Sequence, residues 1–372
     1  MKKKIAMLFP YAPSYREPIY QLMDKELDVD WFFCGNATRN MKMFNYHLLK
    51  HVDLTMKEIK IVGSFTKYKG LDKLKLEQYD VLIVAGVYQN LSEWKIALKY
   101  GRCKKKPALY FWTHGMYGKE SKFRLLVKKF LYHSGQGLFL YGNYAKELMK
   151  SEGFKETTLH VIHNSLDYEN QLTLRSTMKK SIIYRDFFGN NNPVLIFLGR
   201  LTPVKQLDMV IKAIAHLKNK GETYNLVFVG DGEMRQSLEA LAANMNVQNQ
   251  VWFYGACYDE KKNAELVYNA DLCVAPGNIG LTAMHSLMFG CPVLTHDCLK
   301  WQMPEFESVR PNRTGLFFKY QNQNDLEYRI SEWFRVNAFK RNIVRKNCYY
   351  EIDTQWNPQF QLDVIKKVLQ ID

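Results

Sequence analysis

Long hydrophobic runs are missing from this sequence of 372 residues. No apolar stretch reaches the roughly 18 residues that a membrane-spanning helix needs. The charged start at Lys2–Lys4 is followed by an apolar run, Ile5–Phe9, of only five residues before Pro10, which is too short for the core of a signal peptide. The sequence therefore predicts a cytosolic protein, and one long enough for two ordinary domains.

Glycine, proline and cysteine are also scarce, at 21, 11 and 7 residues. The low glycine and proline content excludes collagen-like and low-complexity chains. The cysteines are odd in number and include no C-x-x-C pair, so we expect buried free thiols and no structural zinc. His160 and His163 flank one predicted strand and would point to opposite faces of it, which argues against a shared metal. No metal site is predicted.

Acidic residues are fewer than basic residues, 37 against 52, and the net charge is +15. A basic surplus of this size invites a nucleic-acid interpretation. The surplus is uneven, however, because residues 1–167 hold 28 Lys+Arg and 16 Asp+Glu, while residues 168–372 hold 24 and 21. A balance of +12 in one half and +3 in the other indicates two units with different partners.

Short β-rich apolar runs alternate with segments of helical period along the whole chain. This pattern is typical of a parallel sheet wrapped by helices, so the predicted fold class is α/β with two Rossmann-like, doubly wound domains. The predicted strands are 4–9, 29–33, 60–62, 80–84, 108–112, 137–141, 159–163, 194–199, 225–229, 250–254, 271–275, 292–295 and 315–317. The predicted helices are at about 15–26, 91–101, 121–133, 143–152, 206–219, 233–245, 259–269 and 282–289.

The predicted domains are residues 1–167 and residues 168–372. The join lies in the polar stretch Asp167–Asn192, which has the composition of a linker followed by a turn. A last helix, at about 357–370, is amphipathic and could pack on either half.

Two cations follow the first strand of the second half. Gly199 ends that strand, and Arg200 and Lys205 precede the next helix. Ligands of open α/β sheets bind at the carboxyl ends of the strands, and a planar guanidinium beside a point-charge ammonium suits a diphosphate. The alternative is a pair of solvated surface cations.

A second loop of this half leads from a buried strand to a helix. It comprises Gly277, Asn278, Ile279, Gly280, Leu281 and Thr282. Backbone N–H groups at the start of a helix favour anions; the Thr282 hydroxyl can add a donor, and His285 lies one turn into the helix. Gly230 and Gly232, on either side of Asp231, permit a tight turn, and a purely structural role explains these glycines better than a functional one.

These pieces together resemble a known family, the family 4 glycosyltransferases of GT-B architecture. The matching motifs are, in chain order, Val161–Asp167, Gly199–Lys205, Val229–Gly232, Gly255–Tyr258, Ala270–Pro276, Gly290–Val293 and Thr314–Phe318. Each motif is degenerate, but their order and spacing are specific. The resemblance covers most of the second half and the tail of the first, and it implies two Rossmann-like domains facing across a cleft.

The resemblance implies that the second domain binds a nucleotide-diphosphate sugar. The implied donor-binding residues are Gly199, Asp231, Ala256, Cys257, Gly277, Asn278, Ile279, Gly280, Leu281, Thr282 and His285. Arg200 and Lys205 would stabilise the leaving diphosphate in place of a metal, and the family precedent is retention of anomeric configuration. The family's Glu-x7-Glu signature falls on Gly277 and His285, so neither glutamate is present.

The first half offers two further candidates. His114 ends a predicted strand, and the resemblance implies that it faces the donor sugar in a catalytic position; a hydrogen-bonded core or loop histidine is the alternative. Tyr15 and Arg16 follow the first strand, where a tyrosine ring can stack on a sugar and an arginine can meet phosphate or carboxylate. We therefore predict acceptor binding there, although a plain loop at a helix start would have the same composition.

The basic surplus of the first half is concentrated in Lys2–Lys4, Arg102–Lys106 and Lys122–His133. On a helix, the third segment has an apolar stripe bordered by basic residues. The stripe is Phe123, Leu126, Val127, Phe130 and Leu131, and the basic residues are Lys122, Arg124, Lys128 and Lys129. Such a helix can lie on an anionic membrane or pack on the core with a solvated basic face. No nucleic-acid-binding motif accompanies the charge, so no nucleic-acid partner is predicted.

The sequence thus predicts a metal-independent, retaining, hexosyltransferase-type enzyme without a cofactor, located peripherally on the inner face of the cell membrane. It would move a sugar from a nucleotide-diphosphate donor to a glycan or lipid-linked acceptor, in the biosynthesis of capsule, lipopolysaccharide or another cell-surface polysaccharide. One alternative is a catalytically silent GT-B partner subunit that binds sugar-nucleotide or glycan, and the two missing glutamates favour it. Another is a GT-B epimerase or phosphorylase, which the motifs of the second half disfavour.

Overall fold

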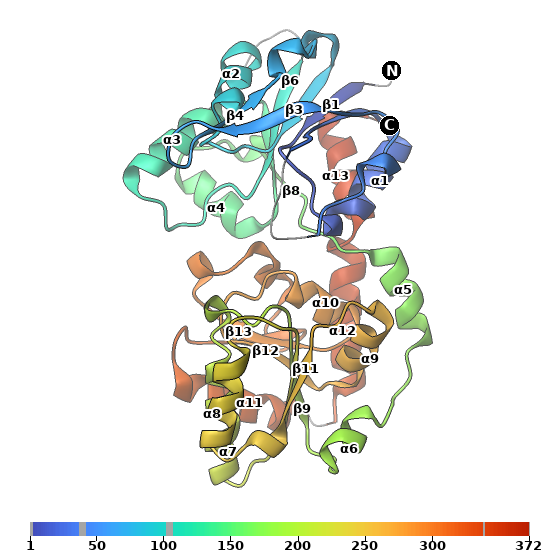
Figure 1. Cartoon of the computed structure of the whole chain (residues 1–372), viewed down its shortest axis with the longest axis vertical. Helices are drawn as coiled ribbons and strands as arrows, with labels where there is room; N and C mark the ends of the chain where they lie inside the picture. Colours follow the sequence, from blue (N-terminus) through green and yellow to red (C-terminus); the bar gives the residue numbers. More distant parts are fainter. Residues whose placement is uncertain (1–2, 37–41, 102–106, 338, 372) are drawn as a thin grey trace. The chain divides into compact units, whose positions relative to one another are not determined.

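The chain folds into two units, each built on its own sheet. The structure is a computed structural model and describes residues 3–36, 42–101, 107–337 and 339–371 (Figure 1). One unit comprises Met1–Asp167 and Asn357–Asp372, and the other comprises Tyr168–Trp356. The last helix, for which the sequence left both halves open, packs with the first unit.

The first unit holds an eight-stranded sheet in the order β4-β3-β2-β1-β5-β6-β7-β8. Every neighbouring pair is parallel except β3 and β4. Its strands are β1 (Lys4–Leu8), β2 (Asp28–Cys34), β3 (Val52–Lys60), β4 (Thr66–Lys69), β5 (Val81–Val84), β6 (Ala108–Thr113), β7 (Gly137–Leu140) and β8 (Leu159–Val161). Its helices are α1 (Glu17–Glu26), α2 (Leu91–Tyr100), α3 (Lys122–His133), α4 (Asn143–Ser151) and α13 (Pro358–Leu369).

One strand prediction in this unit is wrong. Of the expected strand at 60–62, Lys60 is the last residue of β3 and the other two lie in the turn that follows, after which β4 returns as an antiparallel partner of β3. Most β3 residues are exposed or half-buried, because β3 and β4 lie at the edge of the sheet. Their polar and apolar residues are mixed, so a search for continuous buried apolar runs does not find them.

Both faces of this sheet are buried, which explains the continuous apolar character of its central strands. Along β1, Ile5 and Met7 join the core on the face covered by α1 and α13, while Ala6 and Leu8 join the core on the face covered by α2 and α3. This alternation is the two-residue period of a strand. The central strands are therefore fixed in register, and so are the loops that follow them.

Helix α13 brings the end of the chain back to the first unit, where it packs on α1 (Figure 1). The Lys366 ammonium is 2.7 Å from the Glu26 carboxylate, and Gln361 donates to the carbonyl of His163 at 2.9 Å. Leu362 and Ile365 are fully buried in the core. The amphipathic pattern of the last helix predicts burial, but the unit that buries it is decided by tertiary packing.

The second unit holds a six-stranded parallel sheet in the order β11-β10-β9-β12-β13-β14. Its strands are β9 (Val194–Leu198), β10 (Asn225–Val229), β11 (Val251–Gly255), β12 (Leu272–Ala275), β13 (Val293–His296) and β14 (Gly315–Phe318). Its helices are α5 (Tyr168–Thr177), α6 (Ile183–Phe188), α7 (Asp208–Asn219), α8 (Arg235–Asn244), α9 (Glu260–Asn269), α10 (Thr282–Met288), α11 (Gln323–Asn337) and α12 (Arg341–Gln355). Each predicted strand of this half matches one of these to within two residues.

The stretch predicted as a linker is mostly helical. Helix α5 packs on α9 and α10, and α6 buries Tyr184 and stacks Phe187 on Trp252 with ring centroids 4.1 Å apart. Residues 178–182, between the two helices, and the asparagine-rich segment before β9 are irregular. Helix α5 was not predicted because its sequence is mostly polar and lacks an apolar stripe, and its one buried residue is Gln171. No helix within the described ranges is long and apolar enough to cross a membrane.

Candidate functional site

The strand order of the second unit has its reversal point between β9 and β12, where open α/β sheets have their ligand crevice. Strands β10 and β11 extend the sheet to one side of β9, and β13 and β14 extend it beyond β12. Ligands of open α/β sheets bind beside the loops that leave the two strands at such a reversal point. The loops leaving β9 and β12 here are Gly199–Lys205 and Pro276–Leu281, the two segments predicted to bind the donor.

The two predicted cations of this crevice differ in their surroundings. Arg200 is exposed and its guanidinium has no ion pair or hydrogen bond to any described residue. The Lys205 ammonium donates to the backbone oxygen of Asn278 at 2.6 Å and to its side-chain oxygen at 2.8 Å. Burial lowers the pKa of Lys205 to about 8; the charge of the buried Glu305 opposes this shift and the charge of Arg200 adds to it. One of the three ammonium N–H groups remains for a ligand.

Gly277 stands where the resemblance expects a glutamate, and the structure gives a steric reason for glycine. The Gly277 N–H donates to the Lys205 carbonyl at 2.9 Å. A Cβ at this position would lie 2.0 Å from the Val204 carbonyl oxygen, far inside van der Waals contact. The loop after β12 is therefore packed backbone to backbone on the loop that carries Lys205.

Other predicted residues of this loop form structural contacts. The Thr282 hydroxyl donates to the Leu198 carbonyl at 2.8 Å, so its proton is committed to the end of β9. The Ile279 N–H donates to Gln302 at 3.0 Å, and Ile279 is fully buried. Gly280 and Leu281 are half-exposed at the start of α10.

His285 has an acidic neighbour that sequence reasoning missed. Its Nε2 is 3.0 Å from a carboxylate oxygen of Glu260, at the start of α9, and Gln171 donates to the same oxygen at 2.8 Å. Burial raises the pKa of Glu260, but its hydrogen bonds with His285 and Gln171 outweigh this and leave it below the ordinary value. A carboxylate is thus present beside position 285, contributed by another helix and not by the signature spacing.

The remaining predicted donor residues lie on the loops after β10 and β11. The Asp231 carboxylate accepts from the Gly232 N–H at 2.7 Å, and a Cβ on Gly232 would lie 2.4 Å from the Leu201 carbonyl oxygen. These glycines therefore have a packing role. Ala256 is exposed, and the Cys257 carbonyl accepts from an asparagine of α9 at 3.2 Å.

The first unit has a cavity at its own reversal point, between β1 and β5. Its volume is about 400 Å³, enough for a sugar residue. The lining comes largely from the loops after β1, β5 and β6, with further residues from β6 and α3, and it includes Tyr15, Arg16, Trp112, His114 and Lys128. The structure thus brings together the residues that the sequence assigned to the acceptor and the histidine that it assigned to catalysis.

His114 is neutral at physiological pH in this cavity. Burial, together with the positive charges of Arg16 and Lys128, lowers its pKa to about 3. Its ring lies 4.6 Å from that of Tyr141 and 5.7 Å from that of Tyr117, measured between centroids. A neutral imidazole can donate or accept a hydrogen bond, but it carries no charge to offer a substrate.

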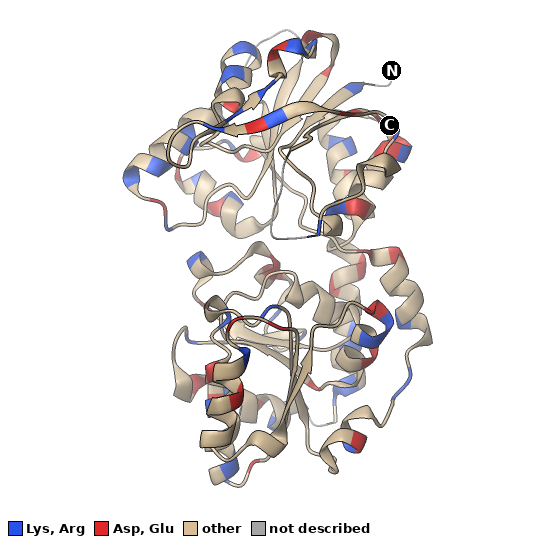
Figure 2. Cartoon of the chain, in the orientation of Figure 1, with Lys and Arg blue, Asp and Glu red and all other residues tan. Residues whose placement is uncertain are grey.

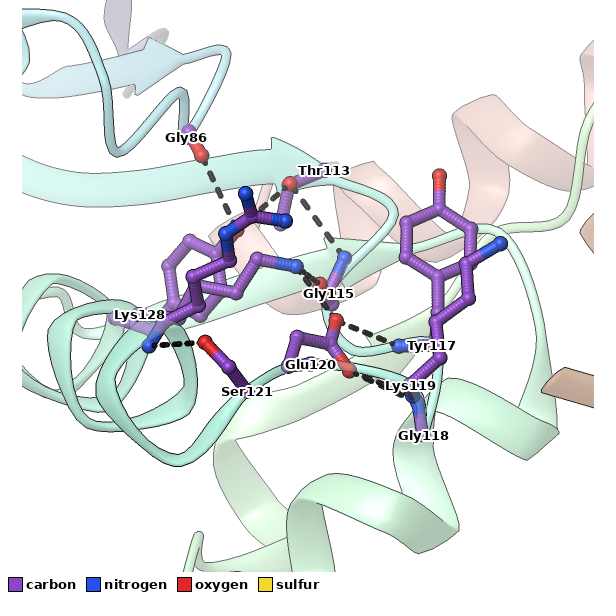
Figure 3. A network of polar contacts seen from close by, with 11 residues as sticks. Gly86, Thr113, Gly115, Tyr117, Gly118, Lys119, Glu120, Ser121 and Lys128 are labelled. Carbon is purple, nitrogen blue, oxygen red and sulfur yellow. Dashed lines mark hydrogen bonds and ion pairs between the residues drawn. The ribbon is translucent and has the colours of Figure 1, made fainter.

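A buried ion pair shapes the loop after His114, and sequence reasoning missed it. The Glu120 carboxylate is 2.8 Å from the Lys128 ammonium, which also donates to the Gly115 carbonyl at 2.9 Å. The same carboxylate accepts from the backbone N–H groups of Tyr117, Gly118 and Lys119 at 2.9, 3.0 and 3.2 Å. Figure 3 shows the loop wrapped around Glu120 and tied to α3 by Lys128. Burial raises the pKa of Glu120, but these contacts keep it below the ordinary value.

A second buried carboxyl supports the cavity from the side of β5. Glu93, on α2, accepts from the Val87 N–H at 2.9 Å and from the Tyr68 hydroxyl at 3.2 Å. Burial raises the pKa of Glu93 to about 8, so the carboxyl is mostly protonated at neutral pH. It holds the loop after β5, whose residues line the cavity.

Helix α3 only partly matches the predicted basic amphipathic helix. Phe123, Leu126 and Phe130 are exposed on one face. Leu131 is buried in the core, and Lys128 points inward to Glu120. Leu131 thus agrees with the core-facing alternative, whereas Lys128 was expected on the surface in both alternatives, and that prediction is wrong. Of the other basic segments, Lys2 and Arg102–Lys106 lie outside the described residues.

Comparisons with known proteins agree with this architecture. Residues 180–349 match a family model described as glycosyl transferases group 1. Two solved structures share the fold over nearly the whole chain. One is the lipopolysaccharide outer core galactosyltransferase WaaB (TM-score 0.69, 14% identity, 99% of each chain). The other is HepE of Anabaena in complex with UDP (TM-score 0.69, 15% identity, 99% of this chain and 100% of that one).

The fold is the GT-B fold. Two parallel-sheet α/β units, with eight and six strands, make up this GT-B chain. A relative known by sequence is an uncharacterised glycosyltransferase of Methanocaldococcus jannaschii, 26% identical over 254 residues. The match covers 64% of this chain and 63% of that relative's length.

Proposed function

We propose that this GT-B protein is a glycosyltransferase that moves a hexose from a nucleotide-diphosphate donor to a glycan or lipid-linked acceptor. The observation that carries the proposal is the placement of Arg200 and Lys205 at the crevice of the second unit. The UDP held by HepE is the kind of ligand that two such cations suit. A cell-surface polysaccharide or lipopolysaccharide is the proposed product class, as the name of WaaB suggests.

The chemistry follows from where charge develops. Breaking the bond between the anomeric carbon and the diphosphate oxygen leaves negative charge on the diphosphate. The Arg200 guanidinium and the Lys205 ammonium would offset that charge, and for this role no metal is needed. The described residues contain no cluster of three or more His, Cys, Asp or Glu side chains placed to hold a metal. We further propose retention of configuration, with the acceptor attacking from the face that the diphosphate leaves.

A panel of nucleotide sugars tests the donor site by thermal stabilisation. We expect at least one to raise the unfolding temperature, and we expect Arg200→Ala or Lys205→Ala to remove that shift. Lys212→Ala is the matched control, because Lys212 only pairs with Asp208 on the surface of α7 at 2.7 Å. A shift that survives both substitutions would rule out this phosphate site.

The pKa of Lys205 predicts how donor binding depends on pH. With a pKa of about 8, the ammonium is charged below pH 8 and loses its proton above it. A bound diphosphate favours the charged form, so the donor Kd should be constant below pH 8 and rise by up to about tenfold per unit above it. Lys205→Arg should bind the donor without that rise, and isothermal titration from pH 7 to 10 measures both. An unchanged wild-type Kd across this range would contradict the assignment.

We also propose that α3 rests on an anionic membrane surface, where a lipid-linked acceptor would be found. Phe123 is 74% exposed and Phe130 is 65% exposed, one above the other on the helix. Lys122, Arg124 and Lys129 border them, and Figure 2 marks the basic residues of α3. Apolar side chains flanked by basic ones are the composition of an interfacial helix.

Vesicle sedimentation tests the α3 surface. We expect binding to phosphatidylglycerol-containing vesicles at low salt, and a decrease of about tenfold or more in the double variant Phe123→Ser, Phe130→Ser, because each phenylalanine buried contributes about 1.5–3 kcal/mol. Tyr328→Ser, on an exposed face of α11 in the second unit, should bind like the wild type. Equal binding of the wild type and the double variant would refute this surface.

A catalytically silent GT-B subunit is the second candidate. The packing of Gly277 on the Lys205 loop favours it, because no side chain can occupy the signature position in this arrangement. Tight nucleotide-sugar binding without sugar transfer or donor hydrolysis would support this candidate over the enzyme.

A further inference from the structure

The cavity of the first unit contains a positive charge without a counter-charge. The Arg16 guanidinium lies among aromatic rings, 5.4 Å from the centroid of Tyr141 and 5.8 Å from that of Trp112. It donates to the hydroxyls of Tyr20 and Tyr141. Within the described part of the chain it forms no ion pair. Burying a charge in this way costs free energy unless a group of opposite charge neutralises it.

Three buried polar atoms of the cavity also lack a hydrogen-bond partner among the described residues. They are Nε of Arg16, Nε1 of Trp112 and Nδ1 of His114, and all three residues line the cavity. Trp112 is only 2% exposed, so its indole N–H cannot rely on bulk water. Unsatisfied buried groups are rare in folded proteins, and each costs about 1–3 kcal/mol. Two of the three atoms can only donate.

The surroundings add to the positive potential. Helix α1 begins at Glu17, directly after Arg16, and the start of a helix carries a partial positive charge. Lys128 also lines the cavity, although Glu120 neutralises it. Among the described residues, Glu58 also lines the cavity, and the charges of Arg16 and Lys128 both lower the pKa of His114.

We propose that this cavity binds an anionic group of the acceptor, a carboxylate or a phosphate, through Arg16 and the indole N–H of Trp112. This inference rests on the proposed function, and it means that the acceptor of the proposed transferase is an acidic sugar. The guanidinium offers a planar fork that fits either anion. Tyr15, Tyr88 and Tyr117, which also line the cavity, present rings on which the sugar bearing that anion can stack.

Binding of small acidic sugars to the protein without donor tests the proposal. The probes are glucuronate, glucose 6-phosphate and neutral glucose, titrated at low salt by isothermal titration or by chemical-shift changes. We expect glucuronate, glucose 6-phosphate or both to bind at least about tenfold more tightly than glucose, as a charge-assisted contact predicts. The better of the two acids identifies the anion as carboxylate or phosphate.

Substitutions then locate the site. Arg16→Met should remove the preference for the acidic sugar and leave glucose binding unchanged. Trp112→Phe keeps the aromatic packing and loses the N–H donor, so it should weaken acidic-sugar binding several-fold even if Arg16→Met does not fold. Arg200→Ala, in the second unit, should keep the full preference. If acidic sugars bind no better than glucose, or if Arg200→Ala removes the preference instead, the proposal is wrong.

These outcomes separate the acceptor class from the proposed function. Nucleotide-sugar binding through Arg200 and Lys205 without a preference for acidic sugars would support the proposed function and contradict this inference. A preference for acidic sugars without any nucleotide-sugar binding would support the anion site and contradict the proposed transferase activity.

Discussion

Gly277→Ala should destabilise the protein by about 3 kcal/mol, the upper part of the range for overpacking, and should abolish donor binding. The added Cβ would lie 2.0 Å from the Val204 carbonyl oxygen and 2.7 Å from the Lys205 Cα. Both are backbone atoms, so the clash cannot be relieved by rotating a side chain. The loop that carries Lys205 must move away from the loop after β12, and the ammonium moves with it.

Urea unfolding and nucleotide-sugar binding measure this effect together. Asn278→Ala is the matched control: it removes one acceptor of the Lys205 ammonium but introduces no clash, so it should cost about 1 kcal/mol and leave donor binding measurable. Gly277→Glu restores the residue of the family signature and should behave like Gly277→Ala or worse. Improved donor binding or activity in Gly277→Glu would show that the loop packs differently from the arrangement described.

Glu120→Ala should destabilise the protein by about 3–5 kcal/mol, the cost of breaking a buried ion pair from one side. The substitution leaves the Lys128 ammonium enclosed with only the Gly115 carbonyl. It also removes the acceptor of three backbone N–H groups in the loop that follows His114. We therefore expect lower stability and a disordered wall of the cavity.

Lys129→Met is the control for this prediction. Lys129 is the neighbour of Lys128 and pairs with Glu152 at 3.0 Å, but both of those side chains are about one-third exposed. An exposed pair contributes about 0–1 kcal/mol, so this variant should unfold almost like the wild type. Urea unfolding at pH 7 compares the two, and equal costs would mean that the Glu120 network does not stabilise the loop.

Much of the fold is predictable because the central strands of both units are buried on both faces. A strand such as β9 or β12 must then be a continuous apolar run, which is visible without a structure. The edge hairpin of β3 and β4 has no such requirement, since one side of each strand is open to water. The helices α5, α6, α11 and α12 are missed for a related reason: each buries only a few of its residues.

The candidate sites divide in the same way. Arg200, Lys205 and the loop from Gly277 are predictable because they directly follow strands, and position along the chain fixes position at the sheet edge. Glu260 beside His285, and Glu120 beneath the loop after His114, are not. Each contributes its carboxylate from a helix start or loop whose partner lies on another element, and no spacing in the sequence indicates the pairing.

The sequence by itself determined the class of fold, the two halves, and the strand ends at which ligands would bind, because burial on both faces of a parallel sheet forces apolar runs of recognisable length. It also located the basic surplus in the first half. The tertiary structure alone decided which of those charges are free. Lys128 is neutralised by Glu120, whereas Arg16 has only hydroxyl partners. Pairing depends on distances between residues far apart in the chain, and Arg16, which has no ion pair with the described residues, marks the place where we propose that an acidic acceptor binds.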